Sequence, residues 1–266
     1  MEIRKIRNDL HEAGFECEKH CFVTYWFPEH ISEDEKARWK RAAFNARKVS
    51  ELTTRRNRRV FLAVCGNEKN ILKCHKLLKR LSKYDEHYFE AVREMVSHKN
   101  FSSQCSIATP RLYLCAEKHI CGIPTEFIMV MEYMGKFRPL LPHETAETAE
   151  LLSLMYNSGC YHPDFKSGNF LINPENGQFA LIDLDQCMMA EKCSADLLAR
   201  HIGRYIYDRL HVHGKKTVTQ FDSNAEELIS CSYKTAKPDL PFNDFLSLIQ
   251  KYTANPSLNV PETYKG

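Results

Sequence analysis

The fold of this chain is decided by His162-Pro163-Asp164-Phe165-Lys166-Ser167-Gly168-Asn169 and, a little further on, by Leu181-Ile182-Asp183-Leu184-Asp185. These stretches contain an Asp, an Asn five residues later, and a second Asp that ends an apolar run. In a phosphoryl-transfer site, the first Asp accepts the proton of an attacking hydroxyl, and the Asn and second Asp hold Mg²⁺. The pattern therefore predicts Asp164 as a catalytic base, and Asn169 and Asp183 as metal ligands.

The residues between the two stretches predict a strand, a turn and a return strand. Residues 170–172 and 179–182 are apolar, and residues 173–177 contain Asn, Pro and Gly. Such a hairpin would bring the three side chains together. Order, spacing and flanking strands all agree with an ATP-dependent kinase.

Length and composition are those of an ordinary globular protein. The chain has 266 residues, 43% of them hydrophobic and 27% charged, enough for one large domain or two intimate lobes. No apolar run reaches the roughly 20 residues of a membrane span. The charged N-terminus lacks the apolar core of a signal peptide, which favours a cytoplasmic location. The eleven cysteines are scattered, and we expect reduced core thiols rather than disulfides or a metal site.

Positive charge is concentrated in the first third of the chain. Residues 1–83 carry 20 Lys/Arg against 11 Asp/Glu, and residues 84–266 carry 17 against 23. Residues 36–59 hold ten Lys/Arg and a single acid, Glu51. This run is either a solvated surface or a binding surface for an anionic partner.

Strand signals dominate the first half of the chain, and helix signals dominate the second. The predicted strands form hairpins over residues 14–27 and 59–74 and a pair at 111–116 and 126–133. The predicted helices run from Ser32 to about Val49, from Leu77 to about Ser97, and over residues 144–157, 194–213, 223–235 and 242–253. This order predicts an α+β, bilobal, protein-kinase-like fold, with a β-rich lobe at 1–133 and a helical lobe at 134–266.

The helix expected at Ser32 has a clear start signal, because a Ser N-cap is followed three residues later by Glu35. Its 3.6-residue period places Trp39 on the packed face and turns Lys36 and Lys40 away from it.

A nucleotide site also needs a cation for the phosphates, oriented by a helical Glu. Lys73 ends the apolar strand Ile71-Leu72-Lys73, as the Lys of V-A-I-K does. Glu86, Glu90 and Glu94 share one face of the following helix. We choose Glu90 as the partner because aromatic residues directly before it can pack on the sheet.

Further residues of the predicted site are the hinge segment, Lys166 and His162. Glu132 and Tyr133 end a buried strand before Gly135 and are expected to form the hinge whose backbone meets adenine. Lys166 is either a cation for the transferring phosphate or an ordinary polar loop residue. His162 either braces the catalytic loop or is a core histidine.

Two features of protein kinases are missing from the sequence. No G-x-G-x-x-G precedes Lys73, and no A-P-E follows Asp183. A small-molecule or glycan kinase needs no long activation segment to dock a peptide, so these absences favour that class.

The chain resembles bacterial lipopolysaccharide core kinases, most closely the heptose(II) kinase type. The resemblance runs from about Val60 to Asp185 and is carried by Asn70-Ile71-Leu72-Lys73, Tyr88-Phe89-Glu90, Phe127-Ile128-Met129-Val130-Met131-Glu132-Tyr133, Asp164-x-x-x-x-Asn169-Phe170-Leu171-Ile172 and Leu181-Ile182-Asp183-Leu184. The chain departs from the family at Cys160-Tyr161-His162-Pro163-Asp164, where a Gly-containing approach is usual.

The resemblance implies phosphorylation of a heptose of the lipopolysaccharide core, with ATP and Mg²⁺, at the cytoplasmic face of the inner membrane. Asp164 would be the base, Asn169 and Asp183 the Mg²⁺ ligands, and Lys73 with Glu90 the phosphate clamp. The acceptor would be an anionic glycolipid, for which residues 36–59 offer charge worth about 1 kcal/mol per Lys or Arg near a membrane. No nucleic-acid partner is expected. The alternatives are a protein kinase, such as a bacterial effector, and a pseudokinase scaffold.

Overall fold

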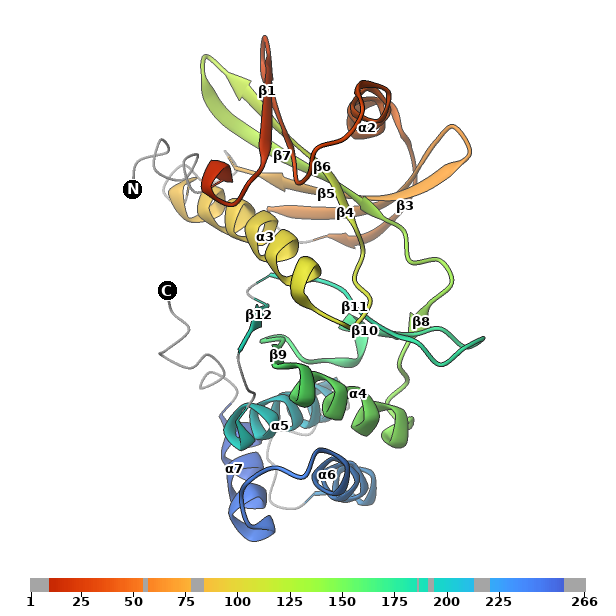
Figure 1. The fold of residues 1–266 in the computed structure, drawn as a ribbon, viewed down its shortest axis with the longest axis vertical. Helices are drawn as coiled ribbons and strands as arrows, with labels where there is room; N and C mark the ends of the chain where they lie inside the picture. Colours follow the sequence, from red (N-terminus) through yellow and green to blue (C-terminus); the bar gives the residue numbers. More distant parts are fainter. Residues whose placement is uncertain are drawn as a thin grey trace. The chain divides into compact units, whose positions relative to one another are not determined.

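The computed structural model describes residues 10–54, 57–77, 84–185, 187–190, 194–212 and 221–255 (Figure 1). The chain divides into two compact units. The first contains residues 1–103 and 110–134, and the second contains residues 104–109 and 135–266. No helix among the described residues is long and apolar enough to cross a membrane.

The first unit is built on an antiparallel sheet of seven strands, in the order β1-β2-β6-β7-β5-β4-β3. Both predicted hairpins and the predicted strand pair are present in it. The strands are β1 (Glu16–His20), β2 (Val23–Phe27), β3 (Arg47–Thr54), β4 (Arg58–Cys65), β5 (Glu68–Lys76), β6 (Leu112–Ile120) and β7 (Ile123–Glu132).

Helix α2 (Glu33–Asn45) begins as the sequence predicts. Ser32 and Glu35 form a reciprocal capping box, which satisfies two backbone N–H groups at the helix start. The predicted extension to Val49 is wrong. Residues 47–49 belong to β3, because Arg47 pairs with Val64 of β4 and the sheet hydrogen bonds replace helical ones.

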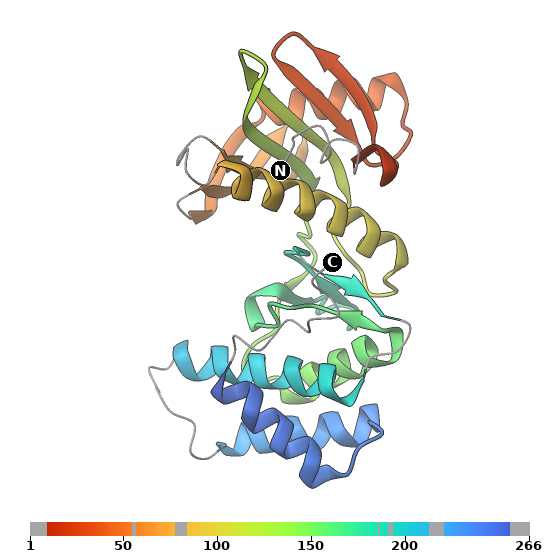
Figure 2. The same cartoon turned by 90° about the vertical axis from the view of Figure 1, so that its left-hand side faces the viewer.

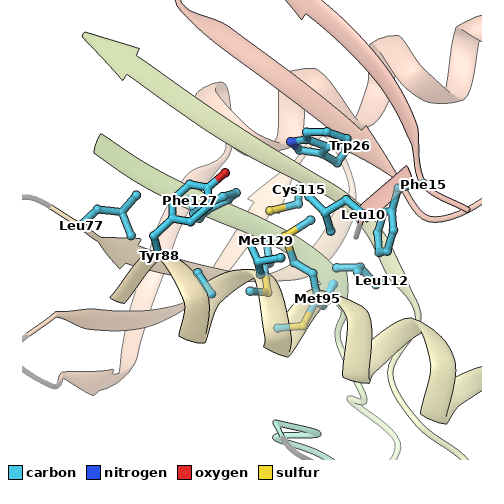
Figure 3. Close-up of a cluster of buried hydrophobic side chains, with 13 residues drawn as sticks. Leu10, Phe15, Trp26, Leu77, Tyr88, Met95, Leu112, Cys115, Phe127 and Met129 are labelled. Atoms are coloured by element: carbon cyan, nitrogen blue, oxygen red, sulfur yellow. The ribbon is translucent and has the colours of Figure 1, made fainter. Parts of the chain in front are cut away.

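Helix α3 (Tyr84–Gln104) covers one face of the sheet. Figure 3 shows Tyr88 and Met95 of this helix among Phe127, Met129 and Cys115 of the strands. The helix runs seven residues beyond its expected end at Ser97. The predicted start at Leu77 is wrong, because this residue is not helical; residues 78–83, which follow it, lie outside the described part of the chain.

The opposite face of the sheet packs against α2. Trp39 of this helix stacks on Tyr113 of β6, with ring centroids 3.9 Å apart and an interplanar angle of 4°. Strand side chains alternate between the two faces. In β5, Leu72 and Cys74 therefore join the cluster under α2, and Ile71 joins the cluster under α3.

The second unit combines short strands with four helices. Strands β8 (Arg138–Pro139), β10 (Phe170–Ile172) and β11 (Phe179–Leu181) form one small sheet, and β9 (Cys160–Tyr161) pairs with β12 (Met188–Met189). The helices are α4 (Thr145–Ser158), α5 (Ala195–Val212), α6 (Ser223–Ala236) and α7 (Phe242–Ala254). Helix α4 packs on α6, and α5 packs on α7; in Figure 2 this second pair is drawn in cyan and dark blue.

The predicted fold class is confirmed: the protein is α+β, with a β-rich first unit and a mainly helical second unit. The predicted hairpin of the catalytic loop and the four predicted helices of the second half are all present, within two residues of their expected bounds.

Candidate active site

Three of the predicted catalytic residues meet in one loop of the second unit. Asp164 follows β9, and Asn169 ends the short 3₁₀ helix η2 (Ser167–Asn169) that leads into β10. The Asn169 amide nitrogen donates to the Asp164 main-chain oxygen at 2.9 Å and to Oδ2 at 3.2 Å. The Lys166 ammonium also donates to Oδ2.

A fourth side chain in this cluster escaped the sequence analysis. Arg204 of α5 donates from Nη2 to the other carboxylate oxygen of Asp164, at a distance of 2.9 Å. Nothing in the sequence distinguishes Arg204 from the other polar positions of an amphipathic helix, and it lies 40 residues beyond Asp164. Asp164 is thus held between two cations, one on each oxygen.

The charges around Asp164 determine its ionisation. Burial raises the pKa of the carboxyl, but the hydrogen bond and charge of Lys166, followed by those of Arg204, outweigh burial and lower the pKa to about 2. Asp164 is therefore ionised at neutral pH. A carboxylate of this acidity is suited to orient a hydroxyl and to take its proton only as the new bond forms.

His162 joins the catalytic loop to the strand before Asp183. Its ring Nε2 lies 3.0 Å from the Ile182 carbonyl oxygen, and because that oxygen only accepts, Nε2 carries the proton. The His162 backbone N–H donates to His201 Nε2 at 3.1 Å. His162 is fully buried, so it is both a core histidine and a brace, the two alternatives that the sequence left open.

Both buried histidines are neutral at pH 7. Burial lowers the pKa of His162, and burial together with the neighbouring His162 lowers the pKa of His201 to about 3. His201 is a second residue that the sequence did not single out. Its role is to accept the hydrogen bond that holds the start of the catalytic loop.

Asp183 follows β11 in a strained backbone conformation. Its φ is +58°, in the left-handed region, which Asp tolerates better than most residues. The preceding residue, Ile182, donates its N–H to the Asn169 carbonyl at 3.0 Å. The two predicted metal ligands therefore sit on segments that are hydrogen-bonded to each other.

The donor set suits Mg²⁺. The Asn169 amide nitrogen is committed to Asp164, which leaves the amide oxygen as the atom that would bind a metal. Mg²⁺ prefers oxygen ligands and typically uses one or two protein groups together with phosphate and water oxygens. In the described part of the chain, no group of three or more His, Cys, Asp and Glu side chains could hold a metal ion. Asn169 and Asp183 thus fit a site that a nucleotide would complete.

In the first unit, Lys73 pairs with Glu94. Lys73 lies inside β5, which continues to Lys76, and its ammonium donates to Glu94 Oε1. Glu94 is 2% exposed, and its Oε2 lies 3.1 Å from His75 Nε2 and 3.7 Å from Arg58 Nη1. One carboxylate therefore serves three basic side chains.

The predicted pairing of Lys73 with Glu90 is wrong. Lys73 does not end its strand, which runs three residues further, and its contact falls one helical turn after Glu90, on Glu94. Glu90 is half-buried. The side chain of Glu86, the third candidate, lies outside the described residues.

Electrostatics hold Glu94 in its ionised form. Burial raises the pKa of the carboxyl, but the charge of Lys73 and then the hydrogen bond and charge of His75 lower it well below its usual range. His98, one turn further along α3, is also buried, and burial lowers its pKa to about 4. The Lys73–Glu94 pair is therefore a charged pair inside a largely apolar layer.

Glu132 and Tyr133 lie where β7 ends. The Glu132 N–H donates to the Arg111 carbonyl at 2.9 Å, and its carboxylate accepts from the Arg111 N–H at 3.1 Å. The Tyr133 side chain is 37% exposed. The Glu132 N–H thus belongs to the sheet, and the adenine contact expected of this segment stays a prediction for its other backbone groups.

Several basic residues of the run at 36–59 are paired with acidic side chains. Lys36 is only 8% exposed and lies 3.0 Å from both Glu18 and Glu33. Lys40 also pairs with Glu18. The prediction that Lys36 faces away from the packed side of α2 is therefore wrong, because acids of β1 draw it inward.

Two arginines of the same run are paired as well. Arg38 binds Glu68 at the start of β5, and Arg59 donates to Glu51 at 2.6 and 2.7 Å. Arg55 and Arg56 lie outside the described residues. The net field of this surface is smaller than the count along the sequence implies.

No family model and no curated protein sequence matches this chain. Among solved structures, one described as "WaaP in complex with acyl carrier protein" is similar over 85% of this chain and 93% of that one, with 11% identity and a TM-score of 0.46. Chemistry does not transfer between chains at that identity. By its own architecture, the protein is α+β, with a β-rich first unit and a mainly helical second unit.

Proposed function

We propose that this chain is a phosphotransferase that uses Mg²⁺ and ATP. The observation that carries the proposal is the catalytic loop, in which Lys166 and Asn169 both donate to the carboxylate of Asp164. Asp164 would orient the acceptor hydroxyl and take its proton, and Lys166 would move to the transferring phosphoryl group to stabilise its charge.

The remaining roles follow from the chemistry of the side chains. The Asn169 amide oxygen and the Asp183 carboxylate would hold Mg²⁺, which neutralises charge on the nucleotide phosphates when bound. Lys73 would bind those phosphates. Glu94 takes the orienting role that the sequence assigned to Glu90, because it is the carboxylate that Lys73 contacts.

The proposed acceptor is a heptose of the lipopolysaccharide core, an anionic glycolipid. This part of the proposal comes from the motif resemblance and from the absence of an A-P-E segment in the sequence. A cytoplasmic protein that contacts the inner membrane through residues 36–59 would suit such an acceptor. The acid partners of Lys36, Arg38, Lys40 and Arg59 weaken that contact.

A protein kinase is the second candidate. The contact between Lys166 and Asp164 favours it, since a Lys two residues after the base is the arrangement we would expect for transfer to a protein hydroxyl. The acceptor experiment below separates the two candidates.

Transfer from radiolabelled ATP to a defined acceptor tests the chemistry. Full-length protein is incubated with Mg²⁺ and either lipopolysaccharide from a core-phosphate-deficient strain or a generic protein substrate. We expect label on the lipopolysaccharide, lost in Asp164→Asn and retained in Asp239→Asn, a surface control on the α6–α7 connection. Label on protein alone would replace the sugar kinase with the protein kinase, and no label on either would remove both.

Membrane contact has its own test, sedimentation with phosphatidylglycerol vesicles and with phosphatidylcholine vesicles. If residues 36–59 make the contact, Arg41→Gln combined with Lys48→Gln should reduce binding to the anionic vesicles and lower its salt dependence. Equal sedimentation with both lipids would assign these residues to an ordinary solvated surface.

A further inference from the structure

A cluster of sulfur atoms lies next to the catalytic loop in the second unit. Cys105 directly follows the last residue of α3, in the segment 104–109 that belongs to this unit. Cys160 is the first residue of β9, four residues before Asp164, and it is fully buried. The two Sγ atoms are 3.1 Å apart.

Both thiols are fixed by their surroundings. Ser158 Oγ donates to Cys160 Sγ at 3.2 Å, and Met189 Sδ lies 3.5 Å from the same sulfur. The segment that carries Cys105 is anchored as well, since Ala108 forms an isolated parallel bridge with Ala180 of β11 and accepts the Leu181 N–H at 2.8 Å. The short separation of the sulfurs is therefore built by two anchored segments of one unit.

We propose that Cys105 and Cys160 are a reversible modification site, at which an oxidant of the hydroperoxide class converts the two thiols into a disulfide. A disulfide needs sulfur atoms about 2.05 Å apart. From their separation of 3.1 Å, the sulfurs must approach by only about 1 Å. The sequence analysis expected reduced thiols throughout, and the described cysteines are free thiols in this structure.

The reaction balances with hydrogen peroxide as the oxidant. The sulfur of half-exposed Cys105 attacks one peroxide oxygen, the O–O bond breaks, and water leaves, which gives a sulfenic acid. The thiolate of Cys160 then attacks the Cys105 sulfur, and the S–O bond breaks. The departing hydroxide takes the proton released by Cys160 and forms a second water. In total, two thiols lose two electrons and two protons, and one peroxide becomes two waters.

Exposure divides the two roles between the thiols. Either sulfur can donate the hydrogen bond that joins Cys105 to Cys160. Cys105 is partly exposed and Cys160 is fully buried, so an oxidant reaches the Cys105 sulfur first. Cys160 is then the neighbouring sulfur that attacks the sulfenic acid.

Intact-mass and peptide analysis of the full chain tests the proposal. The wild-type protein is treated with hydrogen peroxide, alkylated and cut with trypsin, before and after dithiothreitol. We expect a cross-linked pair of peptides, residues 100–111 and 137–166, that each contain one cysteine and that separate on reduction. Cys105→Ser and Cys160→Ser should each abolish the pair, whereas Cys121→Ser, at an exposed cysteine, should leave it unchanged.

Three results would overturn the proposal: both thiols remaining alkylatable while exposed Cys21 and Cys121 are oxidised, Cys160 pairing with a different cysteine, or oxidation that dithiothreitol does not reverse. The wild-type measurement needs no variant, so a Ser variant that fails to fold does not affect it. The result does not depend on phosphotransfer activity, because the mass measurement detects the disulfide itself.

Discussion

At the residue scale, Asp164 has a low pKa because Lys166 and Arg204 contact different oxygens of its carboxylate. The two cations come from separate parts of the chain, so each can be removed alone. Replacing Arg204 by Gln keeps a hydrogen-bond donor and removes the charge. We expect the pKa of Asp164 to rise by about 1 unit, the lower end of what a neighbouring Arg contributes.

Carbon-detected NMR of labelled aspartate carboxyls measures this titration. Arg200→Gln is the matched control, because Arg200 lies one turn earlier on α5 and binds Asp196 at 2.6 Å instead. An Asp164 titration that is the same in both variants would show that Arg204 does not act on its charge.

The carboxylate that serves Lys73 can be identified by stability. Glu94→Gln leaves Lys73 buried beside a neutral amide and should cost about 3–5 kcal/mol of unfolding free energy, the usual effect of removing one partner of a buried ion pair. Glu90→Gln, on the same helix but half-buried, should change it by less than about 0.5 kcal/mol. Urea unfolding of both variants measures the two losses. A larger loss of unfolding free energy in Glu90→Gln than in Glu94→Gln would identify Glu90 as the partner of Lys73.

His201 makes stability depend on pH. Its pKa is about 3 in the folded protein and 6.5 in the unfolded chain, so the unfolded chain binds the extra proton first as the pH falls. The stabilisation is complete above pH 6.5 and is lost progressively towards pH 3. Between pH 6.5 and 5 this one group should cost about 2 kcal/mol, at 1.36 kcal/mol per unit.

His201→Gln separates this titration from that of other groups. A Gln oxygen can accept the His162 N–H and does not titrate, so the variant should lose about 2 kcal/mol less than the wild type between pH 6.5 and 5. His143→Gln, at an exposed position, is the control and should follow the wild type. If the urea midpoint falls by the same amount between pH 6.5 and 5 in all three proteins, His201 is not the cause of the pH dependence.

At the scale of elements, the end of α4 depends on Gly159. Its φ is +72°, and a Cβ there would come within 2.0 Å of the Ala190 carbonyl oxygen. Gly177 has the same φ, but a Cβ there meets nothing within 4 Å. Gly177→Ala should therefore cost only the left-handed strain, about 1–2 kcal/mol, and Gly159→Ala clearly more. Comparing the thermal unfolding of the two variants isolates the clash, and equal melting temperatures would show that the backbone at Ala190 moves away from the methyl group.

The helices and strands were predictable wherever the side-chain period and the capping or turn residues depend only on neighbouring positions in the sequence. The capping box at Ser32, the Gly after α4 and the alternation in β4 and β5 each identify an element from a few adjacent residues. The end of α2 was not predictable in this way. Residues 47–49 are drawn out of the helix by hydrogen bonds to β4, and no local signal reveals a partner strand.

The same limit applies to the candidate site. The order of Asp164, Asn169 and Asp183 predicted that these residues lie on neighbouring segments, and the structure contains these contacts because the residues are close in the sequence. Glu90 and Glu94 lie on adjacent turns of one helix. Which of them pairs with Lys73 depends on how α3 lies on the sheet, and the contact is with Glu94. Arg204 reaches Asp164 from a helix distant in the sequence, and only packing reveals that contact.

At the scale of the whole molecule, the proposed function assigns the nucleotide phosphates to Lys73 and Mg²⁺ to Asp183. If Lys73 binds phosphates and Asp183 binds Mg²⁺, ATP at about 100 times its Kd should stabilise the full chain by about 2.7 kcal/mol in the presence of Mg²⁺. Lys73→Met and Asp183→Ala should each reduce the resulting thermal shift. Lys69→Met, at an exposed position of the same strand, should not. A Mg²⁺-independent shift, or none, would contradict these assignments.

Successive side chains of β5 face opposite sides of the sheet, so the number of residues in this strand decides which side chain reaches Glu94. Leu72 and Cys74 face the α2 layer, and Lys73 reaches Glu94 on the other side. A one-residue slip against β7 would exchange the faces, burying a lysine among apolar side chains and presenting a leucine to Glu94. Insertions should thus be tolerated in the turn at Gly66, which lies outside the paired residues of β4 and β5. Within β5, a single added residue should abolish the contact between Lys73 and Glu94, although the segment still forms a strand.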